Sequence, residues 1–230
     1  MTSHPDTARL AGARPSRVAD LVSLVSDPGI VVGAVVFFVG QRASPGWLGL
    51  RWSALTLLFS VVLPYAVLAL LVRSGRVADR QVVRREQRRV PATAAIACLM
   101  GGITLLRASD APRPLMALML ALFLGLLVIA GLNVFTKVSV HTGTAAGAIA
   151  VLVVEIGWVA LCGLALVVLV GWARARAGRH TVGQVLAGAA IGALVTGLAY
   201  GVGRGPDLGA VAGAAGGMSA TAMLANIGAR

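Results

Sequence analysis

Charge is scarce in this sequence, and negative charge is the scarcest. Only 12% of the 230 residues are charged, with 8 acidic residues against 20 basic ones, and the mean hydropathy is +0.88. A soluble globular domain carries about 25% charged residues, so this composition excludes an ordinary soluble protein. The chain is predicted to be an integral membrane protein with cationic loops, a protein that binds phosphate groups, or both.

Residues that bind metals or form disulfides are equally few. The two cysteines, Cys98 and Cys162, lie inside apolar runs, where a thiol behaves as a small hydrophobic side chain, and there are three histidines. This pattern excludes a zinc-binding spacing and a disulfide framework, and no cofactor is predicted. Aromatic residues make up 5% of the chain and are not interleaved with the arginines, so the positive charge does not predict nucleic-acid binding.

The two ends of the chain differ from its middle. Residues 1–20 are rich in proline, serine and arginine and lack an apolar run of signal-peptide length, so a disordered N-terminal tail is predicted. Residues 21–203 hold the long apolar runs and form the predicted membrane domain. Residues 204–230 form a predicted Gly/Ala-rich C-terminal tail.

Long apolar runs predict the fold. A membrane helix needs about 20 apolar residues, and the candidate runs lie at 29–40, 53–72, 91–106, 115–135, 144–172 and 182–202. The run at 144–172 is too long for one upright helix, and Glu155 and Gly157 lie in its middle, so two short helices joined by a tight turn are expected there. The prediction is an all-α, polytopic bundle of six or seven transmembrane helices.

Small residues recur at a spacing of four within these runs. The pairs are Gly143 and Gly147, Gly188 and Gly192, and Gly197 and Gly201. Such pairs let two helices approach closely. They could pack helices within the chain or join it to a second copy in a homo-oligomer.

Alternate crossings of the membrane gather the cations on one face. That face would hold the N-terminal tail and three polar loops, at 73–89, 136–143 and 173–180, with 14 of the 20 basic residues. The positive-inside rule explains the arginines and favours the cytoplasm for this face. It does not explain why His141 and His180 lie there too, or why Lys137, the only lysine, precedes His141 by four residues. Fixed cations with two histidines at a membrane surface suit a phosphorylated lipid.

Two segments on this face have a characteristic spacing. Ser139 precedes His141 by two residues, and Arg174 precedes His180 by six, with Gln184 four residues later. These segments resemble the motifs PSGH and SRxxxxxHxxxD of the type 2 phosphatidic acid phosphatase (PAP2) superfamily, whose members act through a phosphohistidine. Valines replace the proline and glycine of PSGH, and Gln184 stands where the other motif has aspartate.

The remaining motif of that superfamily, KxxxxxxRP, has only a loose counterpart. Residues 80–91 read RQVVRREQRRVP, with no lysine and no arginine directly before the proline. The resemblance covers roughly residues 73–200. It implies a PAP2-like core within the predicted helix bundle.

The resemblance implies a role for each matched residue. His180 would be the nucleophile that attacks phosphorus, and His141 would protonate the leaving oxygen. Gln184 would accept the imidazole N–H without bringing a charge. Arg174 and Ser139 would hold the phosphoryl oxygens, and no metal would be required because arginines supply the positive charge. The other predicted phosphate-binding residues are Lys137, Arg84, Arg85, Arg88 and Arg89.

The expected function is a membrane lipid phosphatase that removes phosphate from a lipid phosphate or a polyprenyl (di)phosphate. Two alternatives stay open. The neutral Gln184 would also suit a non-catalytic lipid-phosphate binder or transporter. A PAP2-like enzyme that converts prenyl diphosphates would usually need carboxylates that hold magnesium, and this face has only Asp79 and Glu86.

The expected location is a bacterial-type inner membrane. The arginine count favours a cytoplasmic site. Bacterial members of the superfamily commonly act on the outer face, so the side of the membrane stays open. Glu155, a carboxylate within an apolar run, is expected at the opposite face from the histidines.

Overall fold

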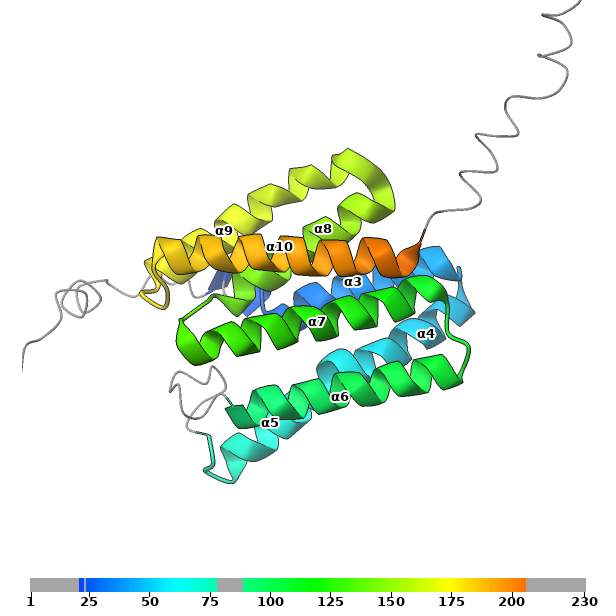
Figure 1. Ribbon diagram of the computed structural model, residues 1–230, viewed down its shortest axis with the longest axis horizontal. Helices are drawn as coiled ribbons and strands as arrows, with labels where there is room; N and C mark the ends of the chain where they lie inside the picture. Colours follow the sequence, from blue (N-terminus) through cyan, green and yellow to red (C-terminus); the bar gives the residue numbers. More distant parts are fainter. Residues whose placement is uncertain (1–20, 23, 78–88, 206–230) are drawn as a thin grey trace, which may run out of the picture.

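The computed structural model describes residues 21–22, 24–77 and 89–205, and every regular element within them is helical (Figure 1). Five helices are long and apolar enough to span a membrane, and Pro28–Ala43, with 16 residues, is a shorter apolar helix. The architecture is therefore a helix bundle whose helices have the length and composition to span a membrane, as the apolar runs predict. The predicted tails lie outside the described residues, except for residues 204 and 205.

The helices follow one another in simple order along the chain. They are α3 (Pro28–Ala43), α4 (Trp47–Leu57), η1 (Leu58–Val62), α5 (Leu63–Arg73), α6 (Arg89–Ala108), α7 (Arg113–Phe135), α8 (Val140–Ile156), η3 (Gly157–Gly163), α9 (Leu164–Arg176) and α10 (Val182–Arg204). The elements α4, η1 and α5 form one continuous span, Trp47–Arg73. Its middle, η1, is a π-helical turn that ends two residues before Pro64, a residue that cannot donate a backbone hydrogen bond.

The longest apolar run reverses direction at a glycine. Helix α8 ends at Ile156, and Gly157 has a φ of 76°, which residues with a Cβ rarely adopt. The short 3₁₀ helix η3 then leads into α9, which runs back beside α8 (Figure 1). The expected pair of helices with a tight turn is confirmed. This reversal returns Arg174, in the last turn of α9, to the end of the bundle where α8 begins.

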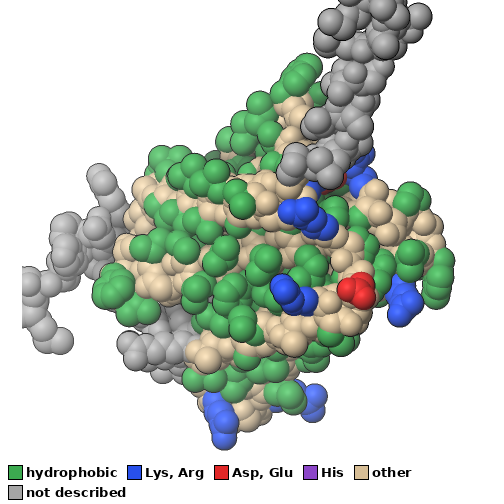
Figure 2. Space-filling view, turned by 45° about the vertical axis from the view of Figure 1, so that its right-hand side comes forward, with side chains coloured by type: hydrophobic (Ala, Val, Ile, Leu, Met, Phe, Trp, Pro, Cys, Tyr) green, Lys and Arg blue, Asp and Glu red, His purple; other side chains and the backbone are tan. Residues whose placement is uncertain are grey.

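The chain thus passes along the bundle seven times within the described residues, counting α4–η1–α5 once. We call the end that holds the starts of α3, α6, α8 and α10 the site end. Apolar side chains cover most of the surface visible in Figure 2, and cationic side chains are exposed at a few separate places. Such a surface suits contact with lipid.

Helices α8 and α10 are in close backbone contact. A Cβ added at Gly192 would lie 2.0 Å from the carbonyl oxygen of Gly143, and one at Gly188 would lie 2.4 Å from the carbonyl oxygen of Ser139. The pairs Gly143/Gly147 and Gly188/Gly192 therefore pack helices within the chain, whereas Gly201 makes no comparably close contact. Their predicted use in a homo-oligomer stays a prediction.

A buried carboxylate joins three helices at the opposite end. Glu155 of α8 pairs with Arg42 Nε of α3 at 3.0 Å and with Arg204 Nε of α10 at 2.6 Å, and it accepts a hydrogen bond of 2.6 Å from the Tyr200 hydroxyl. Its position away from the histidines confirms the expectation from sequence. Because two cations and a hydroxyl surround it, this carboxylate can be buried.

The α8–α10 contact generates a stability prediction. Replacing Gly192 with alanine would push a methyl group into the backbone of Gly143, so we expect the free energy of unfolding to fall by about 1–3 kcal/mol. The matched control is Gly201→Ala on the same helix, where the nearest atom would be 3.9 Å away. Thermal unfolding in detergent compares the two variants. Equal melting temperatures would contradict the contact.

Candidate functional site

The start of α8 forms one wall of the site. Ser139 is fully buried and is the N-cap of α8, with its Oγ accepting the Thr142 N–H at 3.5 Å. Its backbone N–H donates to the carbonyl oxygen of Gln184 at 3.2 Å, and the Thr142 hydroxyl donates to that of Val185 at 3.1 Å. The starts of α8 and α10 are therefore tied together. The Ser139 hydroxyl serves a cap here, and its role as a phosphate ligand stays a prediction.

The start of α10 holds His180 and Gln184. Thr181 is the N-cap, and its Oγ1 accepts the Gln184 N–H at 3.3 Å while Gln184 Oε1 accepts the Thr181 N–H at 3.2 Å. This reciprocal pair is a capping box. The Thr-x-x-Gln spacing would have predicted it from the sequence. His180 therefore precedes the helix, and its proximity to Gln184 comes from the cap and not from a shared helical face.

The capping box also places a hydrogen-bond acceptor beside the His180 ring. Gln184 Oε1 lies 3.3 Å from His180 Nδ1. The same side-chain atom faces the Thr181 N–H, which can only donate, so that atom is the amide oxygen. An amide oxygen can only accept, so this contact is a hydrogen bond in the tautomer that carries its proton on Nδ1 of His180. The lone pair of the neutral ring is then on Nε2, the nitrogen that would attack phosphorus.

Arg174 is the most unusual side chain at this end. Only 6% of its surface is exposed, and its Nε and Nη1 atoms are buried without a hydrogen-bond partner among the described residues. Burying a guanidinium without an acceptor is costly, whereas two such N–H groups match two oxygens of a phosphate or carboxylate. The backbone N–H groups of Arg179 and His180 donate to the Arg174 carbonyl oxygen at 3.1 and 3.3 Å, which fixes His180 close to Arg174.

His141 joins this group from α8. It is half-buried in the first turn of the helix, close enough to Arg174, Arg179 and His180 to interact with each electrostatically. The structure thus brings together His141, Arg174 and the His180–Gln184 pair, which come from three segments of the chain. Their chemical roles stay predictions.

A fourth segment, not singled out in the sequence, supplies a carboxylate. Asp27 is the N-cap of α3, and its Oδ1 accepts hydrogen bonds from the Gly29 N–H at 2.9 Å and from the Tyr65 hydroxyl. It also interacts electrostatically with His141. The Asp-Pro pair before the apolar run signals a helix start. That signal places Asp27 at the site end but does not indicate its neighbour on α8.

Of the remaining predicted phosphate ligands, the structure describes the side chain of Lys137 and not those of the four arginines. Lys137 is exposed in the segment before α8. Arg84, Arg85 and Arg88 lie outside the described residues, and Arg89 begins α6 with its side chain not described. Asp79 and Glu86 also lie outside them. Within the part of the chain that the structure describes, no group of three or more His, Cys, Asp and Glu residues could hold a metal ion.

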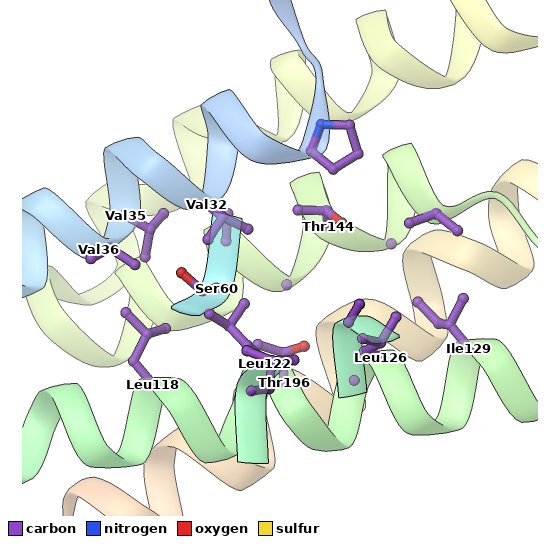
Figure 3. A pocket seen from close by; sticks show the side chains of 18 of the residues that line it. Val32, Val35, Val36, Ser60, Leu118, Leu122, Leu126, Ile129, Thr144 and Thr196 are labelled. Carbon is purple, nitrogen blue, oxygen red and sulfur yellow. The ribbon is translucent and has the colours of Figure 1, made fainter. Parts of the chain in front are cut away.

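An apolar cavity of about 200 Å³ lies inside the bundle, and Figure 3 shows side chains that line it. Near the site end it is lined by Pro28, Tyr65 and Val140, which adjoin or contact Asp27 and His141. Further along the bundle it is lined by side chains of α3, η1, α5, α6, α7, α8 and α10. Those labelled in Figure 3 are Val32, Val35, Val36, Ser60, Leu118, Leu122, Leu126, Ile129, Thr144 and Thr196.

The capping box generates a second stability prediction. Thr181→Ala removes the N-cap acceptor of α10, and we expect the free energy of unfolding to fall by about 1 kcal/mol. The control is Thr104→Ala, because the Thr104 hydroxyl is exposed and bonds only to the Met100 carbonyl of its own helix at 3.0 Å. Thermal unfolding in detergent checks both. A Thr181→Ala protein as stable as the control would show that the cap contributes nothing.

Comparison with known proteins adds no relative to this picture. No protein-family model, no curated protein and no solved structure matches the chain. The candidate site is therefore argued from its own geometry: a buried guanidinium beside two histidines, with one histidine oriented by a glutamine.

Proposed function

We propose that the chain is a membrane lipid phosphatase that removes phosphate from a lipid phosphate or a polyprenyl (di)phosphate through a phosphohistidine. The observation that carries the proposal is Arg174, whose buried Nε and Nη1 have no partner among the described residues. A phosphate group would supply both the missing acceptor oxygens and the missing negative charge. The two histidines beside Arg174 supply a nucleophile and an acid.

The first step transfers the phosphoryl group to His180. Nε2 attacks phosphorus, and the N–P bond forms while the bond from phosphorus to the lipid oxygen breaks. His141 in its protonated form gives its proton to that leaving oxygen. Arg174 holds the non-bridging oxygens, where negative charge is concentrated. The Nδ1–H of His180 keeps its hydrogen bond to Gln184 Oε1 while the ring becomes cationic.

The second step returns His180 to its starting state. Neutral His141 takes a proton from a water molecule as the water oxygen attacks phosphorus. The N–P bond breaks, its electron pair returns to Nε2, and inorganic phosphate leaves. His141 is protonated again, so the cycle closes without a metal and without net change in the protein.

A second candidate function is a lipid-phosphate binder that does not cleave its ligand. One observation favours it: the group beside His180 Nδ1 is a neutral amide, which orients the ring but adds no charge to stabilise the phosphoimidazolium. In serine proteases the comparable loss of charge slows the reaction about 10⁴-fold. Binding without phosphate release distinguishes this function from the first.

We further propose a bacterial-type inner membrane as the location, with the site end on the cytoplasmic side. Seven described basic residues lie at the site end and five at the other end. The site end holds Arg73, Arg76, Arg89, Lys137, Arg174, Arg176 and Arg179, and the other end holds Arg42, Arg51, Arg107, Arg113 and Arg204. An excess of cations favours the cytoplasm.

The phosphatase proposal is tested directly by phosphate release. The purified protein in detergent is offered phosphatidic acid or a polyprenyl diphosphate without added metal, and free phosphate is measured. We expect His180→Ala and Arg174→Ala to lower the rate by about a thousandfold or more, because they remove the nucleophile and the phosphate ligand. Arg176→Ala is the matched control, since Arg176 lies on the same helix and is exposed. Release that survives both substitutions would overturn the mechanism.

A substitution at Gln184 tests the mechanism by an expected gain of activity. Gln184→Glu keeps an acceptor for the Thr181 N–H and places a negative charge beside His180, so we expect kcat to rise by about tenfold or more at neutral pH. Gln184→Met, which cannot accept either hydrogen bond well, serves as the control and should lose activity. An unchanged or lower kcat for Gln184→Glu would argue against a cationic His180 intermediate.

A further inference from the structure

We infer that the apolar cavity beneath the site holds the hydrocarbon chain of the substrate, and that the substrate is a single-chain lipid phosphate. The inference rests on the proposed function of the polar groups at the cavity's near end. It narrows that function, because a lipid phosphate can carry one chain, as an isoprenoid does, or two, as phosphatidic acid does.

The cavity reaches the neighbourhood of the candidate site, although the polar side chains of the site do not themselves line it. Two of the residues that line it are Pro28, which follows Asp27 in the chain, and Val140, which precedes His141. Tyr65 also lines it and bonds to the Asp27 carboxylate. A phosphate held by Arg174 beside His141 would therefore have an apolar path next to it, which leads from Val140 towards Val151 along α8.

The lining is suited to a hydrocarbon and not to water. Valine, leucine, isoleucine, alanine and proline side chains make up most of it. Among its few polar groups, the Ser60 hydroxyl already donates to the Thr56 carbonyl oxygen at 2.8 Å. An apolar cavity of this kind stays dry and can bind an apolar ligand. An unfilled cavity also costs stability, so a space of this size directly below a polar cluster indicates a ligand.

The volume distinguishes one chain from two. An engineered apolar cavity of about 150 Å³ holds one benzene molecule. By the same ratio, the cavity of about 200 Å³ has room for a segment of about eight carbons. Such a segment is the first part of a single chain. Two chains of that length that start side by side from one glycerol would need about twice this volume.

Filling the cavity tests the inference. Ala95 of α6 and Ala148 of α8 both line it, and Ala95→Leu or Ala148→Leu would occupy part of its volume. Ala97→Leu is the matched control, because Ala97 is on α6 but exposed and does not line the cavity. For farnesyl phosphate we expect kcat/KM to fall at least about tenfold in the first two variants only. For p-nitrophenyl phosphate, which has no hydrocarbon chain, we expect kcat/KM to be the same in these variants as in the parent protein.

Three results would overturn the inference. One is a loss for p-nitrophenyl phosphate as large as for farnesyl phosphate. Another is unchanged kcat/KM for farnesyl phosphate in variants whose thermal unfolding matches that of the parent protein. The third concerns the number of chains: dioleoyl phosphatidic acid should be hydrolysed with a kcat/KM at least about tenfold below that of farnesyl phosphate, and equal values would remove the single-chain assignment.

Photolabelling separates this inference from the phosphatase proposal, because it needs no turnover. A farnesyl phosphate analogue with a diazirine in its chain is bound to the full-length protein, irradiated, and mapped by mass spectrometry. Labels at cavity residues of α6, α7 and α8 support the inference, and labels confined to the exposed surface overturn it. Labelling inside the cavity without any phosphate release would keep the cavity assignment and refute the phosphatase. Phosphate release together with labels only on the exposed surface would keep the phosphatase proposal and refute the cavity assignment.

Discussion

The backbone contact between α8 and α10 determines the rest of the site. Glycines on both helices let Gly192 reach the carbonyl oxygen of Gly143, and the Ser139 N–H then bonds to the Gln184 carbonyl at the start of α10. Because the two starts are held together, a histidine after the cap of one helix meets a histidine before the cap of the other. Glu155 fixes the other ends of the same helices through Arg204 and Tyr200. Polar interactions thus hold helices α8 and α10 together at both of their ends.

The electrostatics of the site follow from this geometry. Arg174 is held close to His180 by the turn after α9, and its buried Nε and Nη1 have no hydrogen-bond acceptor in the part of the chain that the structure describes. Asp27 approaches His141 from α3, so the cations face a partly neutralising carboxylate. A low-dielectric cluster with an excess of positive charge and oriented donors favours a dianionic ligand over a neutral one.

The helices could be predicted from the sequence, but the way in which they pack against one another could be predicted only in part. Apolar runs and Gly157 predicted the spans and the reversal, and counting the crossings placed His141 and His180 at one end. The position of Asp27 beside His141 depends on which helices pack together, and hydrophobic length does not encode that choice. The cavity depends on side-chain volumes from several helices and has no local pattern. The bond from the Thr181 N–H to Gln184 Oε1 could have been predicted from the Thr-x-x-Gln spacing, which is typical of a capping box.

Helix α8 has 17 residues and polar groups at both ends, with His141 in its first turn and Glu155 in its last. At 1.5 Å per residue it is about 25 Å long, shorter than the hydrocarbon core of about 30 Å in a typical bilayer. Both ends are best solvated where the bilayer thins around the protein. Thinning would lower the lipid headgroups towards Arg174, so hydrophobic mismatch would itself shorten the path of a phosphate into the site.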